Sequence, residues 1–529
     1  MAQNLMTPGV YIEEKNAFPG SVVEVATAIP AFIGYTERAS KNGKSLINKP
    51  TRITSFADYM ELFGGAFNPR FTLADAQNGD KNLVVVGGKE KSIQYKENNL
   101  VYLFNSIRLF FTNGGGTCYI VSVGTYAGKD SIEIKKDDLL GTGKDANDKP
   151  VEGGLLKLVK ELEPTMVVIP DAVALGLEAY EVYKQVLAHC AKMQNRVAIL
   201  DVFDGYNSRE DGEEDNIKVF REKIGTEYLS YAAAYYPWLD TNVVQKGEIT
   251  FKNFDESVVL EEILPEQRAV TLVKAFPKTA DEFKAMLKAD RPELTDEDLD
   301  ALLPGYIKNK ESNHHLGLLA TSPTYSALLD EIRVVMNLLP AAPAMAGIYT
   351  MVDNSRGVWK APANVGLNSV VKPAVNITHD QQEDLNVNAL SGKSINAIRT
   401  FPGVGTLVWG GRTLDGNSLD WRYINVRRTM IMLEQSIKLA LRAYVFEPND
   451  ANTWVTVKSL ITNFLVEKWK QGALAGSSPE DAFDVQIGLG STMTALDILE
   501  GKMLITVKLA IVRPAEFIVV TFEQQMQKS

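Results

Sequence analysis

Residues 401–485 read FPGVGTLVWGGRTLDGNSLDWRYINVRRTMIMLEQSIKLALRAYVFEPNDANTWVTVKSLITNFLVEKWKQGALAGSSPEDAFDV and carry the most regular pattern of the chain. Within this stretch, apolar side chains recur at the spacing of one helical face: Val426, Met430, Leu433, Ile437, Leu441 and Tyr444. This spacing predicts a helix over residues 425–446, which Pro448 ends because proline cannot continue a helix.

A second helix is expected over residues 454–471, where the side chains divide into two faces. The inward face is apolar and consists of Val457, Ile461, Phe464 and Leu465. Ser459, Asn463, Glu467 and Lys470 form the opposite stripe, with Lys468 beside it. We expect this stripe to face solvent or a polar partner.

Several motifs stand in a fixed order around these helices. They are WGGRT at 409–413, DWRYINVRR at 420–428, FEPND at 446–450 before Trp454, and GALAG at 472–476 after Trp469. This order resembles the C-terminal domain of contractile tail sheath proteins, the subunits of phage-tail-like injection machines. The likeness is greatest to the sheath subunits of extracellular contractile injection systems, although a phage tail and a pyocin remain open.

Further motifs extend the resemblance toward the N-terminus. They are PGVYIEE at 8–14, ITSFADYMELFG at 53–64, FFTNGGGTCYIV at 110–121 and AGIYTMVDNSRGVWKAPAN at 346–364. Ser55 is placed to cap a short helix that ends at Gly64 and Gly65. The resemblance covers about residues 7–125 and 340–525 and is weak over 126–164 and 245–315.

Between residues 164 and 237 the chain alternates strand-like and helix-like segments. Continuous apolar runs at 165–171, 196–204 and 230–237 are separated by helical patterns at 177–193 and 215–224. This alternation predicts a layered α/β domain with buried parallel strands. Charged residues 245–315 then indicate an outward insertion with small helices, one of them a short capped helix at 295–303.

The fold class is therefore α/β and α+β, in several domains. The resemblance implies a conserved α+β sheath core domain built from N- and C-terminal parts, with an inserted subtilisin-like layered α/β outer domain. The expected division is a strand arm at 1–20, an N-terminal sheath region at 21–125, the outer domain at 126–345, the conserved C-terminal domain at 346–512 and a second strand arm at 513–529.

Composition excludes some classes of function. The formal charge of −11 and pI near 5.2 argue against a nucleic-acid-binding surface. No uncharged apolar run approaches about 18 residues, so no membrane insertion is expected, and the N-terminus carries no visible export signal. Cys118 and Cys190 are expected to be buried, reduced thiols.

Enzyme chemistry is poorly supported. The segment GSTMTA at 490–495 superficially resembles a subtilisin nucleophile segment, but the chain has four histidines, His189, His314, His315 and His379. The His pair at 314–315 lacks further ligands at metal-binding spacing and is expected in a polar loop. Three glycines at 114–116 precede a strand, the reverse of a phosphate-binding loop. We therefore expect no catalytic residues, cofactor or metal; an α/β hydrolase is the second candidate.

Three aspartates end predicted strands: Asp171, Asp201 and Asp204. Ligand sites of α/β folds gather at such positions, but no glycine fingerprint accompanies these residues. We expect them to cap helices or form turns.

Both chain ends contain strand-like segments beyond a proline. The N-terminal segment contains Val10, Tyr11, Ile12 and Glu13; the C-terminal one contains Phe517, Ile518, Val519, Val520, Thr521 and Phe522. Because the second is apolar on both faces, it needs a partner, either its own domain or a neighbouring copy. The sheath resemblance implies strand exchange between copies.

The resemblance implies a structural subunit and not an enzyme. Such subunits form a helical homo-oligomer of stacked hexameric rings around an inner tube protein, with baseplate and cap proteins at its ends. The sheath contracts from a metastable extended state and drives the tube through a target envelope. We expect assembly in the bacterial cytoplasm as part of a phage tail or an extracellular particle, with Asn463, Glu467, Lys468 and Lys470 facing the tube.

Overall fold

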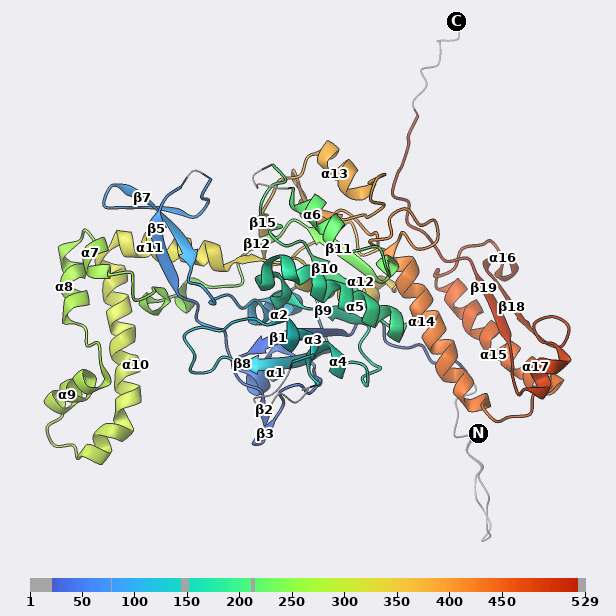
Figure 1. Cartoon of the computed structure of the whole chain (residues 1–529), viewed down its shortest axis with the longest axis horizontal. Helices are drawn as coiled ribbons and strands as arrows, with labels where there is room; N and C mark the ends of the chain where they lie inside the picture. Colours follow the sequence, from blue (N-terminus) through green and yellow to red (C-terminus); the bar gives the residue numbers. More distant parts are fainter. Residues whose placement is uncertain (1–20, 78, 144–151, 211–214, 522–529) are drawn as a thin grey trace, which may run out of the picture. The chain divides into compact units, whose positions relative to one another are not determined.

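The computed structural model describes residues 21–77, 79–143, 152–210 and 215–521, which form two compact units (Figure 1). The central unit comprises Ala28–Ser355 and Ala361–Ile424. The C-terminal unit comprises Met1–Thr27, Arg356–Lys360 and Asn425–Ser529, within which the predicted strand at 10–13 and Phe522 lie outside the described residues. The chain is thus a mixed α/β protein of more than one unit.

A nine-stranded sheet forms the core of the central unit. Its strands in spatial order are β14 (Val365–Gly366), β17 (Gly405–Val408), β16 (Asn396–Phe401), β11 (Ala232–Tyr236), β10 (Val197–Asp201), β9 (Met166–Val168), β1 (Pro30–Thr36), β8 (Cys118–Thr125) and β4 (Thr51–Ile53). Neighbours from β16 to β8 pair in parallel, whereas β14, β17 and β4 pair antiparallel. The predicted buried parallel strands are confirmed.

This sheet crosses the expected domain boundary at 125/126. β1, from the expected N-terminal region, pairs with β8 through Ile33 and Val121 and with β9 through Phe32 and Val168. The boundary at 345/346 falls inside helix α12 (Ala342–Arg356). Neither position is a boundary between the two compact units. At 125/126 the reason is that a strand in the middle of a sheet, such as β1, pairs along both of its edges.

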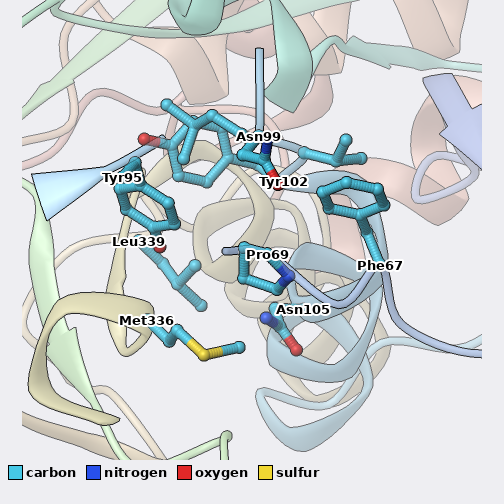
Figure 2. A pocket seen from close by; sticks show the side chains of 10 residues that line it. Phe67, Pro69, Tyr95, Asn99, Tyr102, Asn105, Met336 and Leu339 are labelled. Carbon is cyan, nitrogen blue, oxygen red and sulfur yellow. The ribbon is translucent and has the colours of Figure 1, made fainter. Parts of the chain in front are cut away.

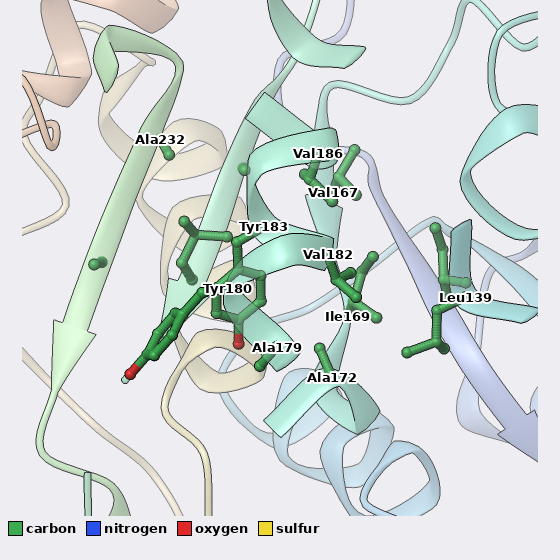
Figure 3. Packing of buried hydrophobic residues seen from close by; sticks show 14 of the residues in the cluster. Leu139, Val167, Ile169, Ala172, Ala179, Tyr180, Val182, Tyr183, Val186 and Ala232 are labelled. Atoms are coloured by element: carbon green, nitrogen blue, oxygen red, sulfur yellow. The ribbon is translucent and has the colours of Figure 1, made fainter. Parts of the chain in front are cut away.

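Helices cover both faces of the sheet, which is why its strands are apolar on both sides. On one face, α5 (Ala179–Met193) and α6 (Asn216–Lys223) pack through a cluster that includes Tyr180 and Tyr183 (Figure 3). On the other, α2 (Leu103–Thr112) places Phe110 against Phe32 of β1, with ring centroids 5.1 Å apart. Helix α12 lies on that second face too.

Two buried aspartates join the sheet to helix N-termini. The Asp171 carboxylate accepts N–H bonds from Tyr35 at 2.9 Å and from Tyr102 and Leu103, at the start of α2, at 2.7 and 3.0 Å. Asp201 accepts the Ala342 N–H at the start of α12, at 2.8 Å. Burial raises the pKa of Asp171 to about 6 and that of Asp201 to about 7. The predicted capping role is confirmed for both.

The third strand-end aspartate, Asp204, forms a turn, as predicted: its φ is 54° and its carbonyl accepts the Asn207 N–H at 2.9 Å. Cys118 and Cys190 are buried free thiols, as expected, and burial raises the pKa of Cys190 to about 12. The cap of Ser55 on α1 (Phe56–Phe63), followed by Gly64, is likewise confirmed.

Shorter elements surround the large sheet. Strands β5 (Phe71–Asp75), β6 (Leu83–Val86) and β7 (Lys89–Tyr95) form a three-stranded sheet, and the turn between β6 and β7 uses positive φ at Gly87 and Gly88. The remaining short elements of the central unit are β2 (Ser40–Lys41), β3 (Lys44–Ser45), α3 (Lys136–Leu140), α4 (Gly154–Lys157), β12 (Leu239–Thr241), β13 (Leu338–Leu339), β15 (Val370–Pro373) and α13 (His379–Asn386).

The insertion is helical, as predicted, but its helices are longer than predicted. They are α7 (Leu260–Ile263), α8 (Gln267–Ala275), α9 (Ala280–Asp290), α10 (Asp296–Thr321) and, after it, α11 (Pro323–Met336). The capping box at Thr295 is present, but α10 continues through Pro304, so the prediction of a short helix at 295–303 is wrong. The same helix contains His314 and His315, so the prediction that they lie in a polar loop is wrong too. Packing of α8 and α9 on α10 outweighs the proline.

Two long helices and a small sheet build the C-terminal unit. The helices are α14 (Ile424–Leu441) and α15 (Ala451–Lys470); the sheet pairs β18 (Phe483–Ile487) with β19 (Ile505–Leu509). Short α16 (Pro479–Ala482) and α17 (Ala495–Leu499) flank it. The predicted helices are confirmed, and Leu433, Ile461 and Leu465 lie in a shared apolar core.

Replacing Asp171 by Asn should lower the free energy of unfolding by about 2–4 kcal/mol. One carboxylate oxygen accepts two N–H bonds and the other accepts one, whereas an amide would direct its own NH₂ at an N–H donor. Urea unfolding measures the difference. Asp130→Asn, in an exposed ion pair with Arg70, should cost less than about 1 kcal/mol. Equal losses of unfolding free energy in the two variants would contradict the role of Asp171 in joining the sheet to α2.

Asp201 also predicts a pH dependence. Its folded pKa is about 7 and its unfolded pKa is about 4, so the folded chain alone holds this proton between those values. The stabilisation of the folded state by this bound proton is complete below about pH 4 and disappears as the pH rises through about 7. Between pH 4.5 and 8, wild type should lose about 3 kcal/mol relative to Asp201→Asn in urea unfolding. Parallel pH profiles for the two proteins would refute the assignment.

Candidate assembly surfaces

The C-terminal segment after β19 presents apolar side chains to solvent. Phe517, Ile518, Val519 and Val520 are between 65% and 88% exposed, and Thr521 is exposed beside them. In the described chain, residues 517–521 belong to no strand, so they do not pair as a strand with their own domain, one of the two alternatives that the sequence left open. Four successive exposed apolar side chains with strand propensity favour pairing of this segment with another strand.

The start of this segment is fixed. The Val512 N–H donates to the Ala473 carbonyl at 3.2 Å, and the Ala475 N–H donates to the Ala510 carbonyl at 2.7 Å. The Asn425 amide Nδ2 donates to the Val512 carbonyl at 3.2 Å. The chain is therefore held on the C-terminal unit up to Val512, and the apolar segment follows.

The β18–β19 sheet has two faces of different character. Phe483, Val485 and Ile487 of β18 belong to the core over the helices, as do Ile505, Val507 and Leu509 of β19. The other face carries Asp484 paired with Lys508 at 3.6 Å. Within the described residues, each of the two strands has the other as its only neighbour, so each leaves one edge for a further strand. The alternation of apolar and polar residues in FDVQI and ITVKL is the pattern of a sheet with one apolar face.

The predicted tube-facing residues separate into two groups on α15. Asn463, Glu467 and Lys470 are exposed, as expected. Lys468 is only 2% exposed, and its ammonium binds the Glu24 carboxylate and the Gln471 side chain, so its expected place at the exposed surface is wrong. Position 468 is close in angle to Phe464 and Leu465, which directs its side chain toward the core.

The residues considered for enzyme chemistry are not assembled into a triad. Ser491 donates its hydroxyl to the Gly488 carbonyl at 3.1 Å and belongs to the C-terminal unit, whose sequence contains no histidine. His189 lies in α5, as predicted, where burial and the nearby Arg196 cation lower its pKa to about 4. It is therefore neutral at pH 7.

The other candidate groups are structural. His314 stacks on Phe276, with ring centroids 4.0 Å apart, and burial lowers its pKa to about 4. Its neighbour His315 meets the Tyr325 hydroxyl at 2.8 Å. Among the described residues, no three His, Cys, Asp or Glu side chains are arranged to hold a metal ion. No helix in the described ranges is long and apolar enough to cross a membrane.

A small cavity lies between the β5–β7 sheet and α2. It measures about 20 Å³ and is lined by residues that include Tyr95, Asn105 and Met336 (Figure 2). The Asn105 Oδ1 is buried there without a hydrogen-bond partner. This volume suits one water molecule and is far too small for a substrate.

The comparisons with known proteins bear on the whole chain. Residues 417–525, which contain α14, α15 and the β18–β19 sheet, match the family model described as the phage tail sheath C-terminal domain. The chain is also similar to the anti-feeding prophage helical sheath in its contracted state, with 28% identity, a TM-score of 0.57 and coverage of 98% of this chain and 99% of that chain. Residues 417–525 thus match the tail sheath C-terminal domain, and the chain as a whole is similar to contractile sheath chains.

Other relatives agree with the tail sheath assignment. A chain of the PVC sheath complex, from an extracellular contractile injection system in the contracted state, is 27% identical, with a TM-score of 0.55 and 99% coverage of both chains. The tail sheath protein of Salmonella phage ViI is 28% identical over 153 residues, or 28% of this chain. The chain spans 24% of the length of that curated relative. The resemblance deduced from the sequence motifs is confirmed.

Proposed function

We propose that this protein is the structural subunit of a contractile sheath. It would polymerise helically around an inner tube and contract from a metastable extended state to drive the tube through a target envelope. The observation that carries the proposal is the full-length similarity to sheath chains, one of them in a helical sheath in the contracted state. The exposed C-terminal segment supports it, because such a segment needs a partner.

Subunits would be linked by strand exchange. The segment 517–522 of one copy would add to a free edge of the β18–β19 sheet of another, and residues 10–13 of a third copy would take the other edge. A two-stranded sheet gains stability from further strands, and an added apolar strand would extend the apolar face that packs on α15. Backbone hydrogen bonds would then connect copies while the central units change their positions.

The free energy of contraction would come from the difference between two lattice packings and not from hydrolysis. The sheath would be held in the extended packing until a trigger at the baseplate releases it. Inner tube, baseplate and cap proteins are its proposed partners, with assembly into a tail-like particle in the bacterial cytoplasm. The role is structural rather than enzymatic, and residues 126–345, which contain β9, β10 and β11, are the proposed subtilisin-like part.

Contact with the tube would be made by the exposed residues Asn463, Glu467 and Lys470 of α15. A contact that must break during contraction is better made of exposed charges and hydrogen bonds than of apolar area, because exposed pairs contribute about 0–1 kcal/mol each. Lys468 is removed from this surface because its ammonium is buried.

Deleting residues 513–529 should abolish sheath formation while the subunit stays folded. The deletion removes the donated strand but leaves every described contact up to Val512. Negative-stain electron microscopy should reveal no tubes, and circular dichroism should resemble that of wild type. Removing only residues 523–529 is the matched control and should leave tubes intact. Normal tubes from the longer deletion would refute strand donation by the C-terminus.

Charge reversal of Lys470 should reduce the fraction of sheaths that contain tube by about tenfold without changing self-association. Lys458→Glu is the control, since Lys458 is exposed on the same helix but lies away from the stripe. Electron microscopy after co-expression with the tube protein gives the fraction. Normal tube loading in Lys470→Glu would reject the assignment of this stripe.

A further inference from the structure

An ion pair with a buried lysine joins residues 22–27, near the N-terminus, to α15. The Lys468 ammonium binds the carboxylate of Glu24, which is 444 residues away in the sequence. It also donates to the Gln471 Oε1 at 2.9 Å and lies 5.6 Å from the centre of the Phe464 ring. The side chain of Glu24 is 38% exposed, so the pair sits at the rim of the core with its lysine inside.

Other contacts hold the same segment. Val22 is buried in the core formed by α14, α15 and the small sheet. The Val25 N–H donates to the Ser436 hydroxyl of α14 at 3.1 Å. At the end of the segment, the Arg428 guanidinium donates to the Thr27 carbonyl at 2.9 Å. Residues 22–27 form no helix or strand, so these bonds to helix side chains replace secondary structure.

Residues 22–27 and residues 510–512 are thus held differently. The approach to the C-terminal segment is fixed by backbone bonds such as that from Val512 to Ala473. Residues 22–27 depend on side chains, among which Lys468 is the most deeply buried charge. A buried ammonium that loses its partner is far more costly than an exposed one, so this pair resists separation.

We propose that the Glu24–Lys468 ion pair anchors the base of the N-terminal segment to the C-terminal unit. A pull on the residues before Val22 then reaches α14 and α15 and does not peel residues 22–27 from the core. The mechanical part rests on the proposed function, in which residues 10–13 bind a neighbouring copy. The anchor would keep copies connected while the sheath contracts.

The anchor itself is tested on unassembled full-length subunits by hydrogen–deuterium exchange. Glu24→Gln should speed exchange in residues 22–27 at least tenfold, because a neutral amide leaves the Lys468 charge without its partner. Exchange in α15 and at 510–512 should stay unchanged, which shows that the variant is folded. Asp484→Asn, which breaks the exposed Asp484–Lys508 pair, is the matched control and should change neither region.

Exchanging the two charges tests whether the Glu24–Lys468 ion pair itself protects residues 22–27, rather than some other effect of each substitution. Glu24→Lys and Lys468→Glu should each lose protection of residues 22–27, and the double variant should regain most of it, to within about threefold of wild type. Unchanged exchange in Glu24→Gln, or a double variant no better than its parents, would overturn the anchor.

Contraction tests the mechanical role. Glu24→Gln sheaths, once assembled and triggered with urea, should break into short pieces, and the fraction of intact contracted sheaths should fall at least fivefold. Intact contraction of this variant would overturn the mechanical role. The exchange result does not depend on strand exchange, so failure of the anchor is distinguishable from failure of the proposed function, which the C-terminal deletion tests.

Discussion

A strand buried in a protein needs hydrogen-bonding neighbours, and this requirement is met differently in the two units. In the central unit, β1 lies between β8 and β9 in a sheet of nine strands. In the C-terminal unit, β18 and β19 have only each other among the described residues, and 517–521 have no strand partner there. All strands of the central sheet except β14 and β4 are thus paired along both edges, whereas β18 and β19 each have one edge left for a further strand, which we propose comes from another copy.

Buried polar groups hold together segments that are distant in sequence. Asp171 connects β1 and the start of α2, and Asp201 connects β10 and the start of α12. Lys468 does the same for residues 22–27 and α15. Each group is stable in the interior only because its partners are placed to satisfy it, so each contact selects one arrangement of its segments.

The motifs pointed to the resemblance to tail sheath proteins, and the apolar periods located several helices and strands, including α5, α14 and α15. The errors have physical causes. Pro304 stops a helix in an isolated sequence, but α8 and α9 pack on α10 and extend it to Thr321. The large sheet continues across residues 125 and 126 because strand pairing joins residues far apart in sequence. Of the assembly residues, Asn463, Glu467 and Lys470 were correctly expected to be exposed.

By itself, the sequence determined the resemblance to tail sheath proteins, the alternation of strands and helices, and the apolar character of 517–522, because these follow from local composition and spacing. Only the tertiary structure decided which strands share the large sheet, how far α10 extends, and that Lys468 meets Glu24. Position on a helix gives the direction of a side chain, but its burial depends on whatever segment covers it. Here that segment comes from the opposite end of the chain, and no local pattern records it.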